Sequence, residues 1–294
     1  MNPALQTLGY GPEDRVVVIH ADDVGMCHAT LVAYDGLLKA GLVSSAAAMV
    51  SCAWFPQLAA YCREHPKCDM GVHLTLNCEW DGFRWGPVST RDAASGLMDE
   101  EGYFHRSPQT TRETASAEAI RVELEAQVAQ ALAAGIDATH IDSHMGTVIH
   151  PDFIEMYARL GLAHGLPPFL IGAEELWEAR YPNHNPGAAS HLIGTALELG
   201  IPLFDNWGMM PLDQPSGRLE AAKRALDALE PGLNLLIIHP AADTPELRAI
   251  ADDWESRVGD YETFSSPELI EHAHRTGVKV IGYRKLRDVL RKAV

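Results

Sequence analysis

The sequence lacks any apolar run that approaches the roughly 20 residues needed to span a membrane. Its first 14 residues contain neither a basic segment nor an apolar core, so no signal peptide is predicted. Basic residues are also scarce: 23 Lys and Arg stand against 40 Asp and Glu, which gives a formal net charge of −17. Such a charge repels phosphate backbones and anionic lipids. We therefore expect a cytoplasmic protein that binds neither nucleic acid nor membranes.

Cysteine pairs with metal-binding or redox spacing are also missing. The five cysteines are an odd number, and none of them forms a Cys-x-x-Cys pair. We expect them to be buried, reduced thiols.

Short apolar runs alternate with amphipathic segments along the whole chain. The apolar runs predict strands at 15–20, 42–50, 69–75, 138–142, 168–171, 233–239 and 278–281. The segments between and after them predict helices at 27–39, 56–64, 114–134, 152–164, 188–199, 219–229, 267–276 and 284–292. Because strands alternate with helices, a parallel sheet is predicted. Seven or eight such units favour an α/β fold of the TIM-like (β/α) barrel type, distorted or incomplete.

No linker, low-complexity tract or repeat divides the chain, so we expect a single catalytic domain over residues 1–294. The sequence is also compatible with a homo-oligomer of this domain. Two segments interrupt the alternation, at about 77–111 and 183–214. The first contains Trp80, Phe83, Trp85, Tyr103 and Phe104. Aromatic loops on an α/β scaffold serve either ligand binding or ordinary loop packing, and the sequence leaves both open.

Polar residues recur at the carboxyl ends of the predicted strands. Asp22 and Asp23 follow the first strand, His73 ends the third, and Asn77 lies just beyond it. The other two strand ends carry His140, Asp142, His144 and His239. These ends converge on one face of a parallel α/β fold, where active sites are built. Their coincidence at four strands predicts a site, although any one of them could be structural.

Carboxylates and neutral imidazoles together form a ligand set for a divalent ion, zinc first and magnesium or another divalent ion as the alternative. An ion with three protein ligands keeps a position open for water, which ionises near neutral pH when bound. Adjacent side chains point in different directions, so the pair Asp22 and Asp23 suits two roles, one as ligand and one as base. A helix N-cap with an acidic first turn is the alternative interpretation of this pair.

These motifs together resemble the YdjC-like carbohydrate deacetylases, which include chitooligosaccharide deacetylases and deacetylases of hopanoid biosynthesis. The resemblance rests on four segments in family order: 20–25 (HADDVG), 71–75 (GVHLT), 139–144 (THIDSH) and 238–240 (IHP). It implies a distorted TIM-like barrel that removes an N-acetyl group from a sugar with the help of a divalent metal ion. The sequence departs from the family pattern at His20, where many members have Asn, and at 145–147, where many have further histidines.

The resemblance also implies roles for individual residues. Asp23, His73 and His144 correspond to the metal ligands, Asp22 to the general base and His239 to the general acid.

Several further residues are expected around these five. We expect His140 and Asp142 to lie behind the ligands and orient them. Arg257 is expected either to position Asp22 through a charge-assisted pair or to form a surface salt bridge. Trp80 and Trp85 are candidates for stacking on a sugar, and the loop residues His150 and His184 have a weaker claim to reach the substrate.

Two other functions remain open at this stage. One is a metal-dependent hydrolase or isomerase acting on a different small polar substrate. The other is a sugar-binding homologue without catalysis, which need not hold a metal ion.

Overall fold

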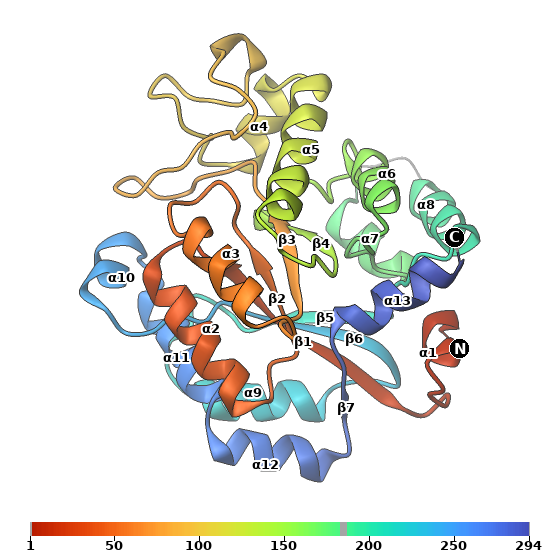
Figure 1. Ribbon diagram of the computed structural model, residues 1–294. Coiled ribbons are helices and arrows are strands. Elements are labelled where there is room, and N and C mark those ends of the chain that lie inside the picture. Colours follow the sequence, from red (N-terminus) through yellow and green to blue (C-terminus); the bar gives the residue numbers. More distant parts are fainter. Residues whose placement is uncertain (1, 183–186, 294) are drawn as a thin grey trace.

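The computed structural model describes residues 2–182 and 187–293 and contains a curled, parallel β-sheet enclosed by helices (Figure 1). Neighbouring strands follow the order β4-β3-β2-β1-β6-β5, and every pairing is parallel. The strands are β1 (Arg15–Val24), β2 (Ser45–Ala48), β3 (Met70–Leu74), β4 (Ile141–Ser143), β5 (Asn206–Met209), β6 (Gly232–Ile238) and β7 (Lys279–Val280). The predicted parallel α/β architecture is confirmed.

The barrel is distorted between β4 and β5, where regular strands give way to single bridges. Ile141 bridges Pro168, and Ile171 bridges Phe204, so the predicted strand at 168–171 contributes only isolated pairs. At the start of β1, the short strand β7 pairs with Val16 and Val17, whereas β2 pairs with His20 and the residues after it. The curl is therefore that of an incomplete TIM-like barrel.

The helices of at least five residues lie around the sheet: α1 (Pro3–Thr7), α2 (His28–Ala40), α3 (Phe55–Glu64), α4 (Pro108–Thr114), α5 (Ala117–Ala133), α6 (Ile154–His164), α7 (Glu174–Arg180), α8 (Ala188–Glu198), α9 (Arg218–Asp227), α10 (Pro245–Ile250), α11 (Trp254–Phe264), α12 (Pro267–Thr276) and α13 (Tyr283–Ala293). Two 3-10 turns, η1 (Ala93–Ser95) and η2 (His144–Gly146), complete the set within the described residues.

Two sequence predictions need correction here. The helix predicted at 114–134 is confirmed as α5 but begins three residues later, at Ala117, because Ser116 adopts an extended conformation and accepts a hydrogen bond from Ala119 N as the N-cap of α5. Part of the segment at 183–214 that was predicted as a loop forms β5, which is the edge strand of the sheet, whereas the helix predicted at 188–199 is confirmed as α8. Strand β5 contains Trp, Gly and Met at successive positions, without the β-branched run that makes strands recognisable.

The sheet supplies the centre of the hydrophobic core. Residues Val16 to Ile19 of β1 are fully buried, as expected for a central strand covered on both faces. All five cysteines are buried and free, which confirms the prediction made for them. The segment between β3 and α5 projects away from the sheet as long loops and α4 (Figure 1). No helix in the described ranges is long and apolar enough to cross a membrane.

Candidate metal and catalytic site

A β-bulge at the end of β1 presents two adjacent carboxylates to the site. Ala21 is paired with Ala46, but Val24 is paired with Ala48, so β1 has one residue more than β2 over this stretch. Asp23 has a φ of 62°, in the left-handed region that Asp tolerates better than most residues. Adjacent side chains of a regular strand point to opposite faces, and bulges near active sites redirect them. The bulge therefore explains why Asp22 and Asp23 both contact His73.

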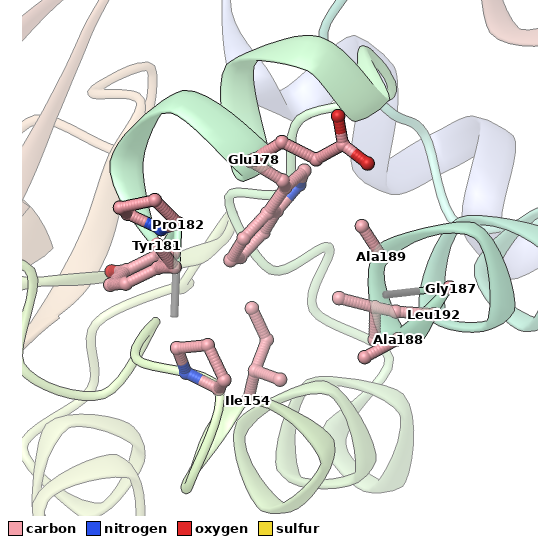
Figure 2. A pocket seen from close by; sticks show the side chains of 10 residues that line it. Ile154, Glu178, Tyr181, Pro182, Gly187, Ala188, Ala189 and Leu192 are labelled. Carbon is pink, nitrogen blue, oxygen red and sulfur yellow. The ribbon is translucent and has the colours of Figure 1, made fainter. Parts of the chain in front are cut away.

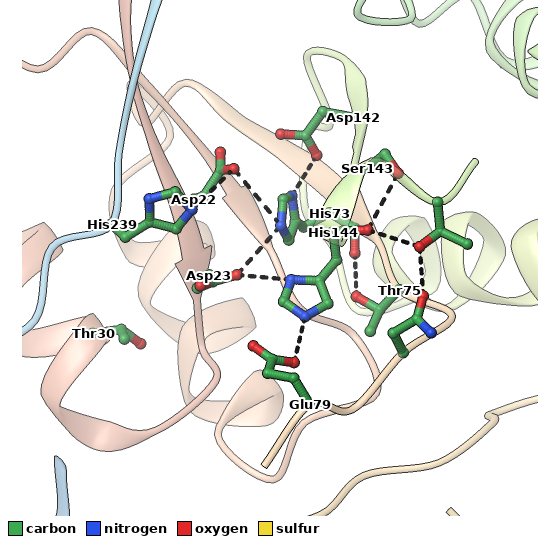
Figure 3. A network of polar contacts seen from close by, with 12 residues as sticks. Asp22, Asp23, Thr30, His73, Thr75, Glu79, Asp142, Ser143, His144 and His239 are labelled. Carbon is green, nitrogen blue, oxygen red and sulfur yellow. Dashed lines mark hydrogen bonds and ion pairs between the residues drawn. The ribbon is translucent and has the colours of Figure 1, made fainter. Parts of the chain in front are cut away.

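Asp23, His73 and His144 bring three potential ligand atoms together from three different strand ends. Asp23 Oδ1 lies 3.1 Å from His144 Nδ1 and 3.3 Å from His73 Nε2. All three side chains are buried, and one ligand atom from each lies within 4.8 Å of the others (Figure 3). Carboxylate oxygen and imidazole nitrogen are the donors that zinc accepts. The chemistry and spacing of this set fit a divalent ion.

Each of the two imidazoles is held on its far side by a second carboxylate. His73 Nδ1 lies 2.8 Å from Asp142 Oδ1, and His144 Nε2 lies 2.9 Å from Glu79 Oε2. Such outer carboxylates fix the orientation of metal-binding imidazoles. Glu79 is the residue that sequence reasoning missed; the available signal was an acidic residue two positions after Asn77 in the loop that follows β3.

The charges around this set are strongly coupled. Burial opposes ionisation of Asp23, but the nearby Arg257 guanidinium and the imidazoles hold its pKa well below the usual range. Burial would lower the pKa of His144, but Glu79 and Asp23 outweigh it and raise that pKa to about 9. An ion that binds His144 must therefore displace a proton from its ring.

Both predictions made for Arg257 are wrong. It is buried, and its Nη1 lies 2.7 Å from Asp23 Oδ2, so it pairs with the proposed ligand and not with Asp22. Its Nε lies 2.7 Å from Asp253 Oδ1 within α11. Burial and the pair with Asp23 rule out a surface salt bridge. The sequence could not show which of two adjacent carboxylates would face α11.

Asp22 and His239 stand beside the three ligand candidates. Asp22 Oδ2 lies 3.7 Å from His239 Nε2 and 3.9 Å from His73 Nε2, beyond hydrogen-bonding distance in both cases. The backbone N–H of His239 donates to Asp260 Oδ2 at 3.0 Å, which anchors this strand end. Asp22 Oδ1 lies 3.1 Å from His20 Nε2, but Asp22 Oδ2 and the ring of His239 make no hydrogen bond to a described residue, so both are available for proton transfer.

His140 and His20 lie on the opposite side of Asp142 from His73. His20 Nε2 is 2.8 Å from Asp142 Oδ2, and His140 stacks on Tyr283 with ring centroids 3.7 Å apart. His20, His140 and Asp142 form a second buried group with metal-ligand spacing, as do Asp22, His73 and Asp142. In both groups Asp142 contacts His20 through one oxygen and His73 through the other. The family resemblance seen in the sequence favours the Asp23 group for the ion.

A cavity of about 240 Å³ opens beside Asp22 and His239. Trp207 of β5 and Phe169 lie on its wall, with ring centroids 6.2 Å apart. Most of the other lining side chains are apolar: Met145, Ile149, Ile171, Leu176, Trp177, Met209, Leu235 and Ile237. The cavity offers aromatic surface next to the two proton-transfer candidates.

The other predicted site residues lie away from this cavity. Trp85 is buried, and its Nε1 donates to Asn77 O at 2.8 Å, so it has no free face for a sugar. The guanidinium of Arg257 lies over the ring of Trp80, with its central carbon 5.3 Å from the ring centroid. The side chain of Asn77 bonds to Thr111 and Thr147 and joins two loops. His150 lies in the turn before α6, and His184 falls outside the described residues.

A second cavity of about 330 Å³ adjoins the first, since Trp177 and Tyr181 line both (Figure 2). Its walls come from α6, α7 and α8, and Glu178 is the one charged side chain among its lining residues. Asp22, Asp142 and His239 line the first cavity and not the second.

Comparison with known proteins agrees with this architecture. The family model described as "YdjC-like protein" matches residues 16–274. A carbohydrate deacetylase from Thermus thermophilus is 34% identical over 281 residues, covering 90% of this chain and 91% of the relative. A carbohydrate deacetylase from Brevibacillus brevis is 32% identical and covers 62% of this chain and 71% of the relative.

A solved structure from Enterococcus faecalis, described as a "putative cellobiose-phosphate cleavage protein", shares the fold and superposes with a TM-score of 0.76 at 22% identity. The match covers 93% of this chain and 99% of that one. Since the family model spans most of the sequence, the chain belongs to the YdjC-like protein family.

Proposed function

We propose that this protein is a metal-dependent deacetylase that removes the N-acetyl group from a sugar or oligosaccharide. The observation that carries the proposal is the convergence of Asp23, His73 and His144 next to Asp22 and His239. Two relatives above 30% identity are named carbohydrate deacetylases, which supports the same reaction class.

Asp23 Oδ1, His73 Nε2 and His144 Nδ1 would hold the divalent ion, for which zinc is the first expectation. When bound there, the ion supplies Lewis acidity toward a water molecule and toward the acetyl carbonyl. Asp142 and Glu79 keep the two imidazoles oriented from behind.

Proton transfer is assigned to Asp22, through its Oδ2 atom, and to the ring of His239, neither of which is hydrogen-bonded to a described residue. Asp22 accepts the proton of the attacking water through a carboxylate oxygen. His239 Nε2 donates a proton to the sugar nitrogen as its bond to the acetyl carbon breaks, because an amine leaves only when protonated. Their 3.7 Å separation supports roles for both groups at one reacting centre.

The sugar is assigned to the cavity lined by Trp207 and Phe169. Aromatic faces pack against the apolar faces of sugar rings, and binding pockets generally combine such surface with a few polar groups. Trp207 thereby takes the stacking role that the sequence suggested for Trp80 and Trp85.

The test is acetate release from N-acetylglucosamine and its short oligomers by the purified protein. Activity should disappear after chelation and return with Zn²⁺ or Mg²⁺ added alone. Full activity without metal would contradict the metal assignment. Stoichiometric metal binding without acetate release would favour another small polar substrate, and binding of sugar without metal would favour a non-catalytic homologue.

A further inference from the structure

His20 is a buried titratable residue to which the proposed mechanism gives no role. It lies in β1, two residues before Asp22, and its side chain is 1% exposed. One ring nitrogen, Nε2, faces two carboxylates at once: Asp142 Oδ2 at 2.8 Å and Asp22 Oδ1 at 3.1 Å. Burying an imidazole between two acids is costly unless the ring carries a charge.

Among the described residues, the imidazolium of His20 is the cationic group nearest to the Asp22 carboxylate. Asp22 Oδ1 accepts no hydrogen bond there, and its Oδ2 lies 3.7 Å from His239 and 3.9 Å from His73. His20 is therefore the group best placed to compensate the charge of Asp22 and to limit its movement.

The ring of His20 packs against the stacked rings of His140 and Tyr283, whose centroids are 3.7 Å apart. Its edge contacts are with His140, at a centroid distance of 4.9 Å, and with Tyr283, at 5.7 Å. The backbone of His20 is paired with Ser45 on one side and Ile237 on the other. These ring contacts and the pairing of the backbone on both sides keep Nε2 directed at the two carboxylates.

The charges support an imidazolium at this position. Burial would lower the pKa of His20, but its contacts with Asp142 and Asp22 outweigh it and raise that pKa to about 9. Asp142 also holds His73 through its other oxygen, so one chain of contacts runs from Asp22 through His20 and Asp142 to a proposed metal ligand.

We propose that His20 is a positioning residue that holds the base Asp22 in its reactive orientation and ties it to Asp142, the carboxylate that orients His73. This inference rests on the proposed function for the role of Asp22. The contact itself belongs to the protein with or without substrate.

The first test separates this role from packing. His20→Phe keeps an aromatic ring against the stacked pair His140 and Tyr283 but removes the ring nitrogens. It should retain metal and KM and lose about 10- to 100-fold in kcat, the usual effect of removing an orienting partner. His20→Gln keeps a neutral donor and should recover part of the loss. Tyr283→Phe is the matched control and should keep wild-type kcat.

If His20→Phe keeps wild-type kcat and full metal content, then His20 only fills space in the core and does not position Asp22. Loss of metal in both His20 variants would overturn the assignment to Asp22 and make His20 part of the metal site. If His20→Phe does not fold, His20→Gln decides the matter alone, because a kcat equal to wild type would contradict the proposal.

A second test does not depend on activity. In metal-free protein with ¹⁵N-labelled histidine, Asp22→Asn and Asp142→Asn should each shift the ring-nitrogen resonances of His20. Unchanged resonances in Asp22→Asn would show that the contact is not made in solution and would sink the proposal. Shifted resonances in a protein that releases no acetate from any sugar would instead locate the failure in the proposed function.

Discussion

Arg257 Nη1 lies 2.7 Å from Asp23 Oδ2, and both side chains are 2% exposed. A guanidinium from α11 thus compensates the carboxylate that we assign to the metal ion. Removing one partner of a buried pair leaves the other charge uncompensated, which costs about 3–5 kcal/mol. A divalent ion on the other oxygen of Asp23 would offset much of that cost.

We therefore expect Arg257→Met to destabilise the metal-free protein by about 3–5 kcal/mol and the Zn²⁺-saturated protein by clearly less. The measurement is urea unfolding with and without metal. Arg218→Met is the matched control, because Arg218 forms a similarly buried pair with Asp260 away from the three ligand candidates. Arg218→Met should lower the free energy of unfolding equally in the metal-free and the Zn²⁺-saturated protein. If Arg257→Met also lowers it equally in both, an ion at Asp23 is contradicted.

The ligand assignment predicts different metal contents for three histidine variants. His73→Ala and His144→Ala should each lose bound metal, because each removes a nitrogen that faces Asp23. His140→Ala should retain it, since that ring stacks on Tyr283 and bonds to Thr139. Metal analysis of the purified variants checks this. If His140→Ala strips the metal and His144→Ala does not, the His20–His140–Asp142 group is the site.

The separate roles of Asp22 and His239 predict different substrate dependence. Asp22→Asn should keep metal and lose about 10²- to 10⁴-fold in turnover on any acetyl substrate, because water must be activated in each case. His239→Ala should lose far more activity on an N-acetyl sugar than on an acetyl phenyl ester, whose phenolate leaves without protonation. Rates on both substrates provide the measurement. Equal damage by the two variants on both substrates would contradict separate acid and base roles.

Two tryptophans should behave differently because one lines the cavity and the other lies in the core. Trp207→Ala should raise KM about 5- to 30-fold, equivalent to 1–2 kcal/mol of lost binding, without changing metal content. Trp85→Ala should lower stability by about 3–5 kcal/mol, as for other buried aromatic residues. Steady-state kinetics and urea unfolding on the same preparations separate the two effects. If KM rises more in Trp85→Ala than in Trp207→Ala, the sugar binds at the 77–111 segment and not at Trp207.

The raised pKa of His20 predicts a pH-dependent contribution to stability. Its pKa is about 9 in the folded protein against 6.5 for an ordinary histidine, so the folded state binds the proton more tightly. The contribution is complete below pH 6.5 and is lost as the pH rises through about 9. In metal-free protein, the stability advantage of wild type over His20→Gln should shrink between pH 6.5 and 9.5. An advantage that grows with pH would mean that the folded ring is neutral.

The sequence alone determined the architecture and the polar set at the strand ends. Strands alternating with helices can bury their apolar surface as a curled parallel sheet, and the carboxyl ends of parallel strands meet at one face. That logic brought Asp22, Asp23, His73, Asp142, His144 and His239 together without knowledge of any distance. It failed at β5, because a strand of Trp, Gly and Met is stabilised by its pairing with β6 and not by local preference.

Contacts between distant segments were decided only by the tertiary structure. The bulge in β1 turned Asp23 toward Arg257, which lies 234 positions later in the chain. Glu79 reached His144 across 65 positions, and His20 reached Asp142 across 122. Trp207 lines the cavity beside Asp22 and His239 because β5 lies at the sheet edge next to β6. Periodicity reports which face of an element is buried, but the partner of a buried charge depends on how the elements pack, which no local pattern encodes.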